Sequence, residues 1–180
     1  MLDEAPIDLR QYPVLVVDDE EAIVKTFKLN YARDFTIVGT SSPSEALRLL
    51  EDEPIAVLVT DQRMPEMQGT ELIRRALERK PGLMPIILTG YADVEALAQA
   101  VNLRRVYGYV PKPWDRDQLR DVITRAIETF HVVRENTKLV GENARLVTEL
   151  ERANEQLRRE NRFLQSQTST GGFEIGRAHV

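Results

Sequence analysis

The chain has 180 residues, a formal charge of −5 and no cysteine, and 42% of its residues are hydrophobic. This length accommodates one domain of ordinary size with an appendage. The lack of cysteine excludes disulfides, thiolate metal sites and cysteine nucleophiles, and it fits a cytoplasmic location, which we expect. No run approaches the roughly 20 apolar residues that cross a bilayer, and an acidic chain does not attract a phosphate backbone. We therefore expect no membrane association and no nucleic-acid partner for this portion of the protein.

Five short apolar runs predict the strands of a parallel sheet. Runs of this length are typical of strands that are buried on both faces. The runs cover Val14–Val17, Phe35–Val38, Val57–Val59, Met84–Leu88 and Tyr107–Val110.

Helical patterns alternate with these runs. Ser42, which precedes Pro43, and Asp93 are residue types that commonly begin helices. The alternation of strand and helix predicts an α/β fold, an open parallel sheet with helices on both faces. The helical patterns cover Glu20–Tyr31, Pro43–Leu50, Gly69–Arg79, Asp93–Asn102 and the chain from Asp115 onward.

The last helix is predicted to continue beyond the end of the domain. From Val122 to about Gln165 the chain has no proline, and Gly141 is the only glycine. The apolar residues fit a seven-residue repeat, and asparagine at an a position favours a two-stranded coiled coil in fixed register. A competing frame, which begins at Val133, fits slightly less well. In the favoured frame, a is Thr129, Asn136, Asn143, Leu150, Leu157 and Leu164, and d is Val132, Leu139, Leu146, Ala153 and Glu160.

These patterns divide the chain into three parts. Residues 12–130 are predicted to form the domain, residues 131–165 a dimeric coiled coil, and residues 166–180 a disordered tail rich in serine, threonine and glycine at its start. We interpret EIGRAHV at Glu174–Val180 as a sequencing artefact. Alternatively, Phe173–Arg177 begins a genuine output domain. On either interpretation we expect the natural protein to continue beyond this chain.

Polar side chains follow four of the predicted strands. They are Asp18 and Asp19, Asp61, Thr89 and Lys112. Because the carboxyl ends of parallel strands meet at one edge of a sheet, we expect these groups to converge. Three clustered carboxylates repel one another unless a cation intervenes, and the cation that best suits oxygen ligands here is Mg²⁺. This group of side chains suits phosphoryl transfer onto Asp61, with Lys112 as a second positive charge.

Four segments resemble the receiver domain of bacterial response regulators. Each is weak alone, but four in order at strand ends are specific, and the resemblance covers roughly Tyr12–Phe130. It implies a CheY-like, flavodoxin-like doubly wound sheet of five strands in the order 2-1-3-4-5 with five helices. It also implies a phospho-accepting signalling domain and not an enzyme. The segments are VVDDEE at Val16–Glu21, VTDQRMPEMQG at Val59–Gly69, LTGYAD at Leu88–Asp93 and YVPKPW at Tyr109–Trp114.

The resemblance assigns roles to the acidic residues of the site. It makes Asp61 the phosphorylated residue and Asp19 a direct Mg²⁺ ligand. Asp18 becomes a second acidic ligand that acts largely through water, and the main-chain carbonyl of Arg63 completes the protein ligands.

The resemblance also assigns the remaining site residues and the partners. Thr89 would hydrogen-bond the phosphoryl group, Lys112 would pair with it, and Tyr109 matches the aromatic switch position. Pro113 would follow a cis peptide bond. Most receivers have a pair of small residues ahead of the switch aromatic, and the bulkier residues at Leu103–Tyr107 depart from this pattern. The implied donor is a sensor histidine kinase, and the coiled coil would carry the change to an output domain absent from this chain.

Simpler roles and a second function class remain open at this point. Asp18 and Asp19 could cap a helix, Thr89 and Tyr109 could be ordinary strand and core residues, and Lys112 could be a surface lysine. A magnesium-dependent phosphohydrolase would need D-x-D after the first strand, where this chain has two adjacent aspartates. A dinucleotide binder is disfavoured because G-x-G-x-x-G is absent.

Overall fold

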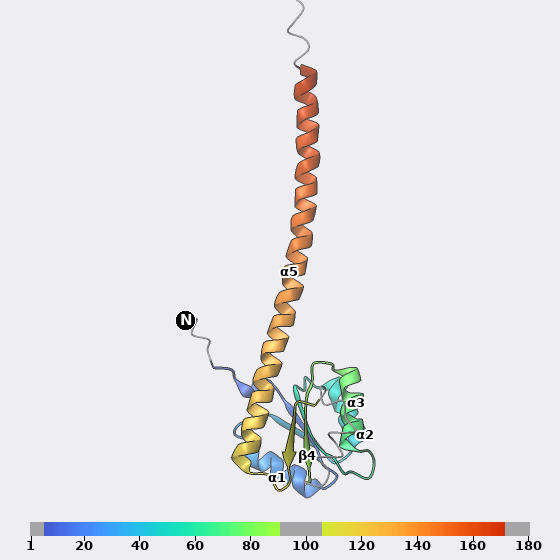
Figure 1. Cartoon of the computed structure of the whole chain (residues 1–180), viewed down its shortest axis with the longest axis vertical. Coiled ribbons are helices and arrows are strands. Elements are labelled where there is room, and N and C mark those ends of the chain that lie inside the picture. Colours follow the sequence, from blue (N-terminus) through green and yellow to red (C-terminus); the bar gives the residue numbers. More distant parts are fainter. Residues whose placement is uncertain (1–5, 91–105, 172–180) are drawn as a thin grey trace, which may run out of the picture. The chain divides into compact units, whose positions relative to one another are not determined.

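The computed structural model describes residues 6–90 and 106–171 (Figure 1). The chain divides into two compact units, Met1–Arg134 and Glu135–Val180. Within the two described ranges, no helix combines the length and the apolar character that crossing a membrane requires.

The first unit is built on a five-stranded parallel sheet. The strand order is β2-β1-β3-β4-β5, and every neighbouring pair is parallel. This confirms the predicted fold class and strand order. The strands are β1 (Val14–Val17), β2 (Ile37–Thr40), β3 (Val57–Asp61), β4 (Met84–Thr89) and β5 (Gly108–Pro111).

Two strands lie later in the chain than predicted. Phe35 was assigned to the second strand, but its backbone N–H bonds the Tyr31 carbonyl at the end of the preceding helix and its ring is buried there. The strand instead runs on to Thr40, which pairs with Val17. The last strand likewise ends at Pro111. A proline is tolerated there because β5 is an edge strand.

Four α-helices and one short 3₁₀-helix lie in the described residues. The fifth predicted helix, Asp93–Asn102, lies outside them. Ser42 caps its helix as predicted, since its hydroxyl accepts a hydrogen bond from the Glu45 N–H at 3.3 Å. The sequence did not predict the 3₁₀-helix. The helices are η1 (Leu9–Gln11), α1 (Glu21–Tyr31), α2 (Pro43–Asp52), α3 (Gly69–Arg79) and α5 (Arg116–Gly171).

Side chains of successive strand residues pack in two separate hydrophobic cores, one on each face of the sheet. Val14 and Val16 pack with Phe27 of α1 and with the first part of α5, which contributes Ile123. Leu15, one residue along β1, packs on the opposite face with side chains of α2 and α3. Helices therefore cover both faces, and the central strands β1, β3 and β4 are largely apolar because both of their faces are buried.

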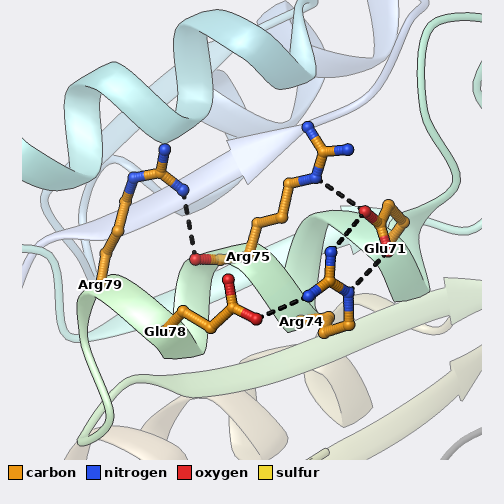
Figure 2. A network of polar contacts seen from close by, with 5 residues as sticks. All are labelled: Glu71, Arg74, Arg75, Glu78 and Arg79. Atoms are coloured by element: carbon orange, nitrogen blue, oxygen red, sulfur yellow. Dashed lines mark hydrogen bonds and ion pairs between the residues drawn. The ribbon is translucent and has the colours of Figure 1, made fainter.

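The exposed face of α3 carries a network of ion pairs (Figure 2). The Glu71 carboxylate lies 2.8 Å from Arg74 and 2.7 Å from Arg75, and Arg74 also lies 2.6 Å from Glu78. These hydrogen bonds, chiefly that from Arg74, lower the pKa of Glu71 to about 2. Because the pairs are exposed, each contributes little to stability. The network gives the helix modest support through pairs three and four residues apart.

The described part of the second unit is the portion of helix α5 that follows Arg134. The predicted long helix is confirmed, but its predicted end near Gln165 is too early, because the helix continues to Gly171. The hydroxyls of Ser166, Thr168 and Ser169 donate to carbonyls three or four residues earlier, so these polar residues are accommodated within the helix.

Candidate functional site

The predicted site lies at the carboxyl edge of the sheet. Asp18 directly follows β1, Asp61 is the last residue of β3, and Lys112 directly follows β5. Strands β1 and β3 are hydrogen-bonded neighbours in register, which places the two aspartates side by side. The apolar strands fix these positions because a register slip would expose their buried side chains.

A single ammonium group bridges the two aspartates. The Lys112 Nζ lies 2.8 Å from Asp61 Oδ1 and 3.4 Å from Asp18 Oδ2. The side chains of Asp18, Asp61 and Lys112 are only 2%, 11% and 29% exposed. Asp18 Oδ1 also accepts a hydrogen bond from the Glu20 backbone N–H at 3.0 Å. The structure therefore brings together three of the predicted site residues.

The electrostatics of this cluster favour a further cation. Burial raises the pKa of Asp18, and the neighbouring Asp61 carboxylate adds to this effect. Burial lowers the pKa of Lys112, but the contacts with the two carboxylates outweigh it, so this pKa is raised overall. Two buried carboxylates thus share one positive charge. Their hard oxygen atoms suit Mg²⁺, which would supply the missing positive charge.

The third predicted carboxylate does not join this cluster. Asp19 is exposed, at the point where the chain turns from β1 toward α1. Among residues 6–90 and 106–171, no three acidic or histidine side chains gather closely enough to hold a metal ion. The structure therefore brings two of the three predicted carboxylates together, and the metal-binding role of Asp19 stays a prediction. Arg63 is also exposed, two residues beyond β3.

The two predicted switch residues lie on the neighbouring strands. Thr89 ends β4, is buried, and its hydroxyl donates to the Gly90 carbonyl at 3.4 Å. Tyr109 lies on β5, paired with Ile87 of β4. Its buried hydroxyl has no hydrogen-bond partner within the part of the chain that the structure describes, and burial raises its pKa. A rearrangement that gave this hydroxyl a partner would be stabilising.

The segment after β5 has the predicted backbone form. The Lys112–Pro113 peptide bond is cis, as the resemblance implied. The Trp114 ring follows, with its centroid 6.0 Å from the Lys112 Nζ. Trp114 is the only tryptophan of the chain, so its fluorescence is a local probe of the site.

The sequence did not indicate how the loop after Asp61 is held. The Glu66 carboxylate accepts hydrogen bonds from Ser42 Oγ at 3.0 Å and from the Ser44 backbone N–H at 2.9 Å, and it also contacts Ser44 Oγ. These bonds, chiefly that from the Ser44 side chain, lower the pKa of Glu66. The loop is thereby tied to the start of α2. Spacing along the chain does not reveal this contact, because Glu66 lies more than 20 residues after the two serines.

Comparisons with known proteins show what this chain is similar to. A family model described as the response regulator receiver domain matches residues 14–124. The hydrogenase transcriptional regulatory protein HoxA of Cupriavidus necator is 37% identical over 119 residues, which make up 66% of this chain and 25% of HoxA. The chain therefore spans about a quarter of the length of that relative.

Solved structures with a similar fold include receiver domains. A response regulator receiver domain protein from Clostridium thermocellum is 29% identical with a TM-score of 0.63, and the match covers 68% of this chain and 98% of that one. A structure titled adenylate cyclase from Rhodopirellula baltica is 31% identical with a TM-score of 0.69, and the match covers 72% of this chain and 96% of that one.

Proposed function

The chain belongs to the response regulator receiver family, and from this premise we propose that Asp61 accepts a phosphoryl group from a sensor histidine kinase. Receiver domains are phospho-accepting signalling modules of two-component systems. The observation that supports Asp61 as the acceptor is its place at the end of a buried strand, with the Lys112 ammonium 2.8 Å from its carboxylate. The partnership with such a kinase implies a cytoplasmic location.

The proposed transfer follows from the positions of the side chains. An Asp61 carboxylate oxygen attacks the phosphorus of the donor phosphohistidine in line, and the bond between phosphorus and the imidazole nitrogen breaks. The product is an acyl phosphate on Asp61 and a free imidazole on the kinase. The Lys112 ammonium, already against Asp61, then pairs with a phosphoryl oxygen and balances part of its charge.

Receiver domains typically bind Mg²⁺, and the buried pair of carboxylates fits it. Asp18, Asp61, the main-chain carbonyl of Arg63 and Asp19, after a movement of its exposed side chain, would hold the ion. The bound ion would neutralise charge on the phosphoryl oxygens.

We propose that Thr89 and Tyr109 report the phosphorylated state. Within the described residues the Thr89 hydroxyl donates a long bond of 3.4 Å to the Gly90 carbonyl, so a phosphoryl group on Asp61 would offer it a stronger, charged acceptor. Movement of Thr89 would then let the Tyr109 side chain turn and give its buried hydroxyl a partner. This would change the surface next to β4 and β5.

We propose that α5 pairs with the same helix of a second chain and passes this change to an output domain. The side chains of Leu139, Leu146, Leu150 and Leu157 are each more than half exposed in the single chain. Burying each leucine would stabilise a pair by about 1.5–3 kcal/mol. Asn136 and Asn143 favour a parallel pair because each can hydrogen-bond its counterpart only when the two chains are in register.

Phosphoryl acceptance is tested with a small donor. The full chain is incubated with acetyl phosphate and Mg²⁺, and its intact mass is measured. We expect the wild type to gain one phosphoryl group and Asp61→Asn to gain none. Asp52→Asn, which alters an exposed aspartate on α2, is the matched control and should react as the wild type does. An equal adduct on Asp61→Asn would contradict the proposal.

A further inference from the structure

The N-terminus of helix α3 is capped by a residue that does not adjoin the helix in sequence. Gln68, the residue that precedes it, makes no side-chain hydrogen bond to the first turn. The first backbone N–H groups of a helix have no partner within the helix. In this structure the first two are bonded by Gln62, the residue that follows Asp61. Its main-chain carbonyl accepts from the Gly69 N–H at 3.0 Å, and its side-chain Oε1 accepts from the Thr70 N–H at 3.1 Å.

The other polar groups of Gln62 are also bonded. Its backbone N–H donates to the Leu88 carbonyl of β4 at 3.1 Å, and its side-chain Nε2 donates to Thr70 Oγ1 at 3.4 Å. Gln62 is also nearly fully buried, at 9% exposure. A buried side-chain amide with both ends satisfied holds its neighbours in one arrangement. Gln62 thus joins the end of β3 to β4 on one side and to α3 on the other.

These bonds from Gln62 close the loop that follows the acceptor Asp61. The loop of seven residues, 62–68, begins at Gln62 and returns beside it at the start of α3. It includes Arg63, whose carbonyl is a proposed Mg²⁺ ligand. The return is tight: a methyl group on Gly69 would lie 2.3 Å from the Asp61 carbonyl oxygen. The backbone of Asp61 therefore lies against the helix end that Gln62 caps.

We propose that Gln62 is a positioning residue for the acceptor site. Its amide fixes Asp61 and the Arg63 carbonyl against α3, and thereby sets the affinity of the site for Mg²⁺ and the rate at which Asp61 is phosphorylated. This inference rests on the proposed phosphoryl acceptance at Asp61. A residue that only stabilised the fold would change the melting temperature without changing the Mg²⁺ affinity of the folded protein.

The test measures Mg²⁺ affinity by titrating the full chain with magnesium chloride and following Trp114 fluorescence. Gln62→Met keeps the approximate length of the side chain but removes both amide bonds. We expect it to weaken Mg²⁺ binding about tenfold, as loss of a residue that orients metal ligands typically does. It should also slow labelling by acetyl phosphate. Thr70→Val removes only the hydroxyl, and we expect a loss of about threefold, in line with one neutral hydrogen bond.

Two further variants make the result specific. The double variant Gln62→Met with Thr70→Val should bind Mg²⁺ no more weakly than Gln62→Met alone, because the two changes break one interaction. Thr36→Val is the matched control: it removes a hydroxyl that donates to the Arg10 carbonyl at 2.8 Å, before β2 and at the opposite edge of the sheet. It should leave Mg²⁺ affinity unchanged.

Each outcome decides between the proposals. A folded Gln62→Met that binds Mg²⁺ as tightly as the wild type would overturn the positioning role and leave phosphorylation of Asp61 intact. If Gln62→Met does not fold, unchanged Mg²⁺ affinity of Thr70→Val would overturn the role in the same way. By contrast, an undiminished phosphoryl adduct on Asp61→Asn would overturn the proposed function itself.

Discussion

Gly69 at the start of α3 lies against the backbone of Asp61, and Gly69→Ala tests that contact. The added methyl group would lie 2.3 Å from the Asp61 carbonyl oxygen and 3.1 Å from both the Asp61 carbonyl carbon and Gln62 Cα. All three atoms are backbone, so the contact is relieved only if α3 or the end of β3 shifts. Overpacking of this kind costs about 1–3 kcal/mol. For a chain of this size, each kcal/mol lowers the melting temperature by about 2–4 °C.

Thermal unfolding followed by circular dichroism measures this loss, and labelling by acetyl phosphate measures its effect on the site. Two other glycines provide controls, because a methyl group on Gly82 or Gly141 meets nothing within 4 Å. Gly82→Ala should be tolerated. Gly141→Ala, within α5, should stabilise that helix by up to about 1 kcal/mol. A Gly69→Ala variant that melts and is labelled like the wild type would refute the close packing of α3 on Asp61.

Two further predictions concern the surface of the domain and the long helix. Because Arg74 and Arg75 lower the pKa of Glu71 from 4.5 to about 2, this carboxylate contributes stability above pH 4.5 and loses its contribution as the pH falls toward 2. An NMR titration of the glutamate carboxyl carbons should show Glu71 as the last glutamate to be protonated as the pH falls. A titration midpoint near 4.5 for Glu71 would show that the ion pairs do not persist in solution. Light scattering should find the full chain dimeric, and Leu150→Lys combined with Leu157→Lys should make it monomeric, because two lysines would replace leucines at the proposed interface of each helix. A wild-type chain that is monomeric at high micromolar concentration would contradict the pairing.

Much of the fold follows from local patterns in the sequence. The apolar runs and helical periods predicted the alternation of strands and helices, and the strand order followed from the family resemblance. The second strand was placed too early because Phe35 has the residue type of a strand. Its backbone N–H instead bonds the Tyr31 carbonyl, and its buried ring packs beside Tyr31 just after α1. The end of α5 was placed too early because serine and threonine favour helix ends. Their bonds to preceding carbonyls are compatible with a longer helix.

The candidate site could also be predicted only in part from the sequence. Position after a buried strand was enough to bring Asp18, Asp61 and Lys112 together. It was not enough for Asp19, whose side chain depends on how the chain turns into α1. Gln62 was missed because its partner, Thr70, becomes a neighbour only when the loop after β3 closes on α3.

The central claim, that Asp61 carries the phosphoryl group, is tested most directly by chemical trapping. Borohydride reduces an acyl phosphate on aspartate to the alcohol, which converts that residue to homoserine. After incubation of the full chain with acetyl phosphate and Mg²⁺, reduction and digestion, tandem mass spectrometry locates the converted residue. We predict homoserine at position 61 alone. Homoserine at any other aspartate, with residue 61 unchanged, would contradict the account.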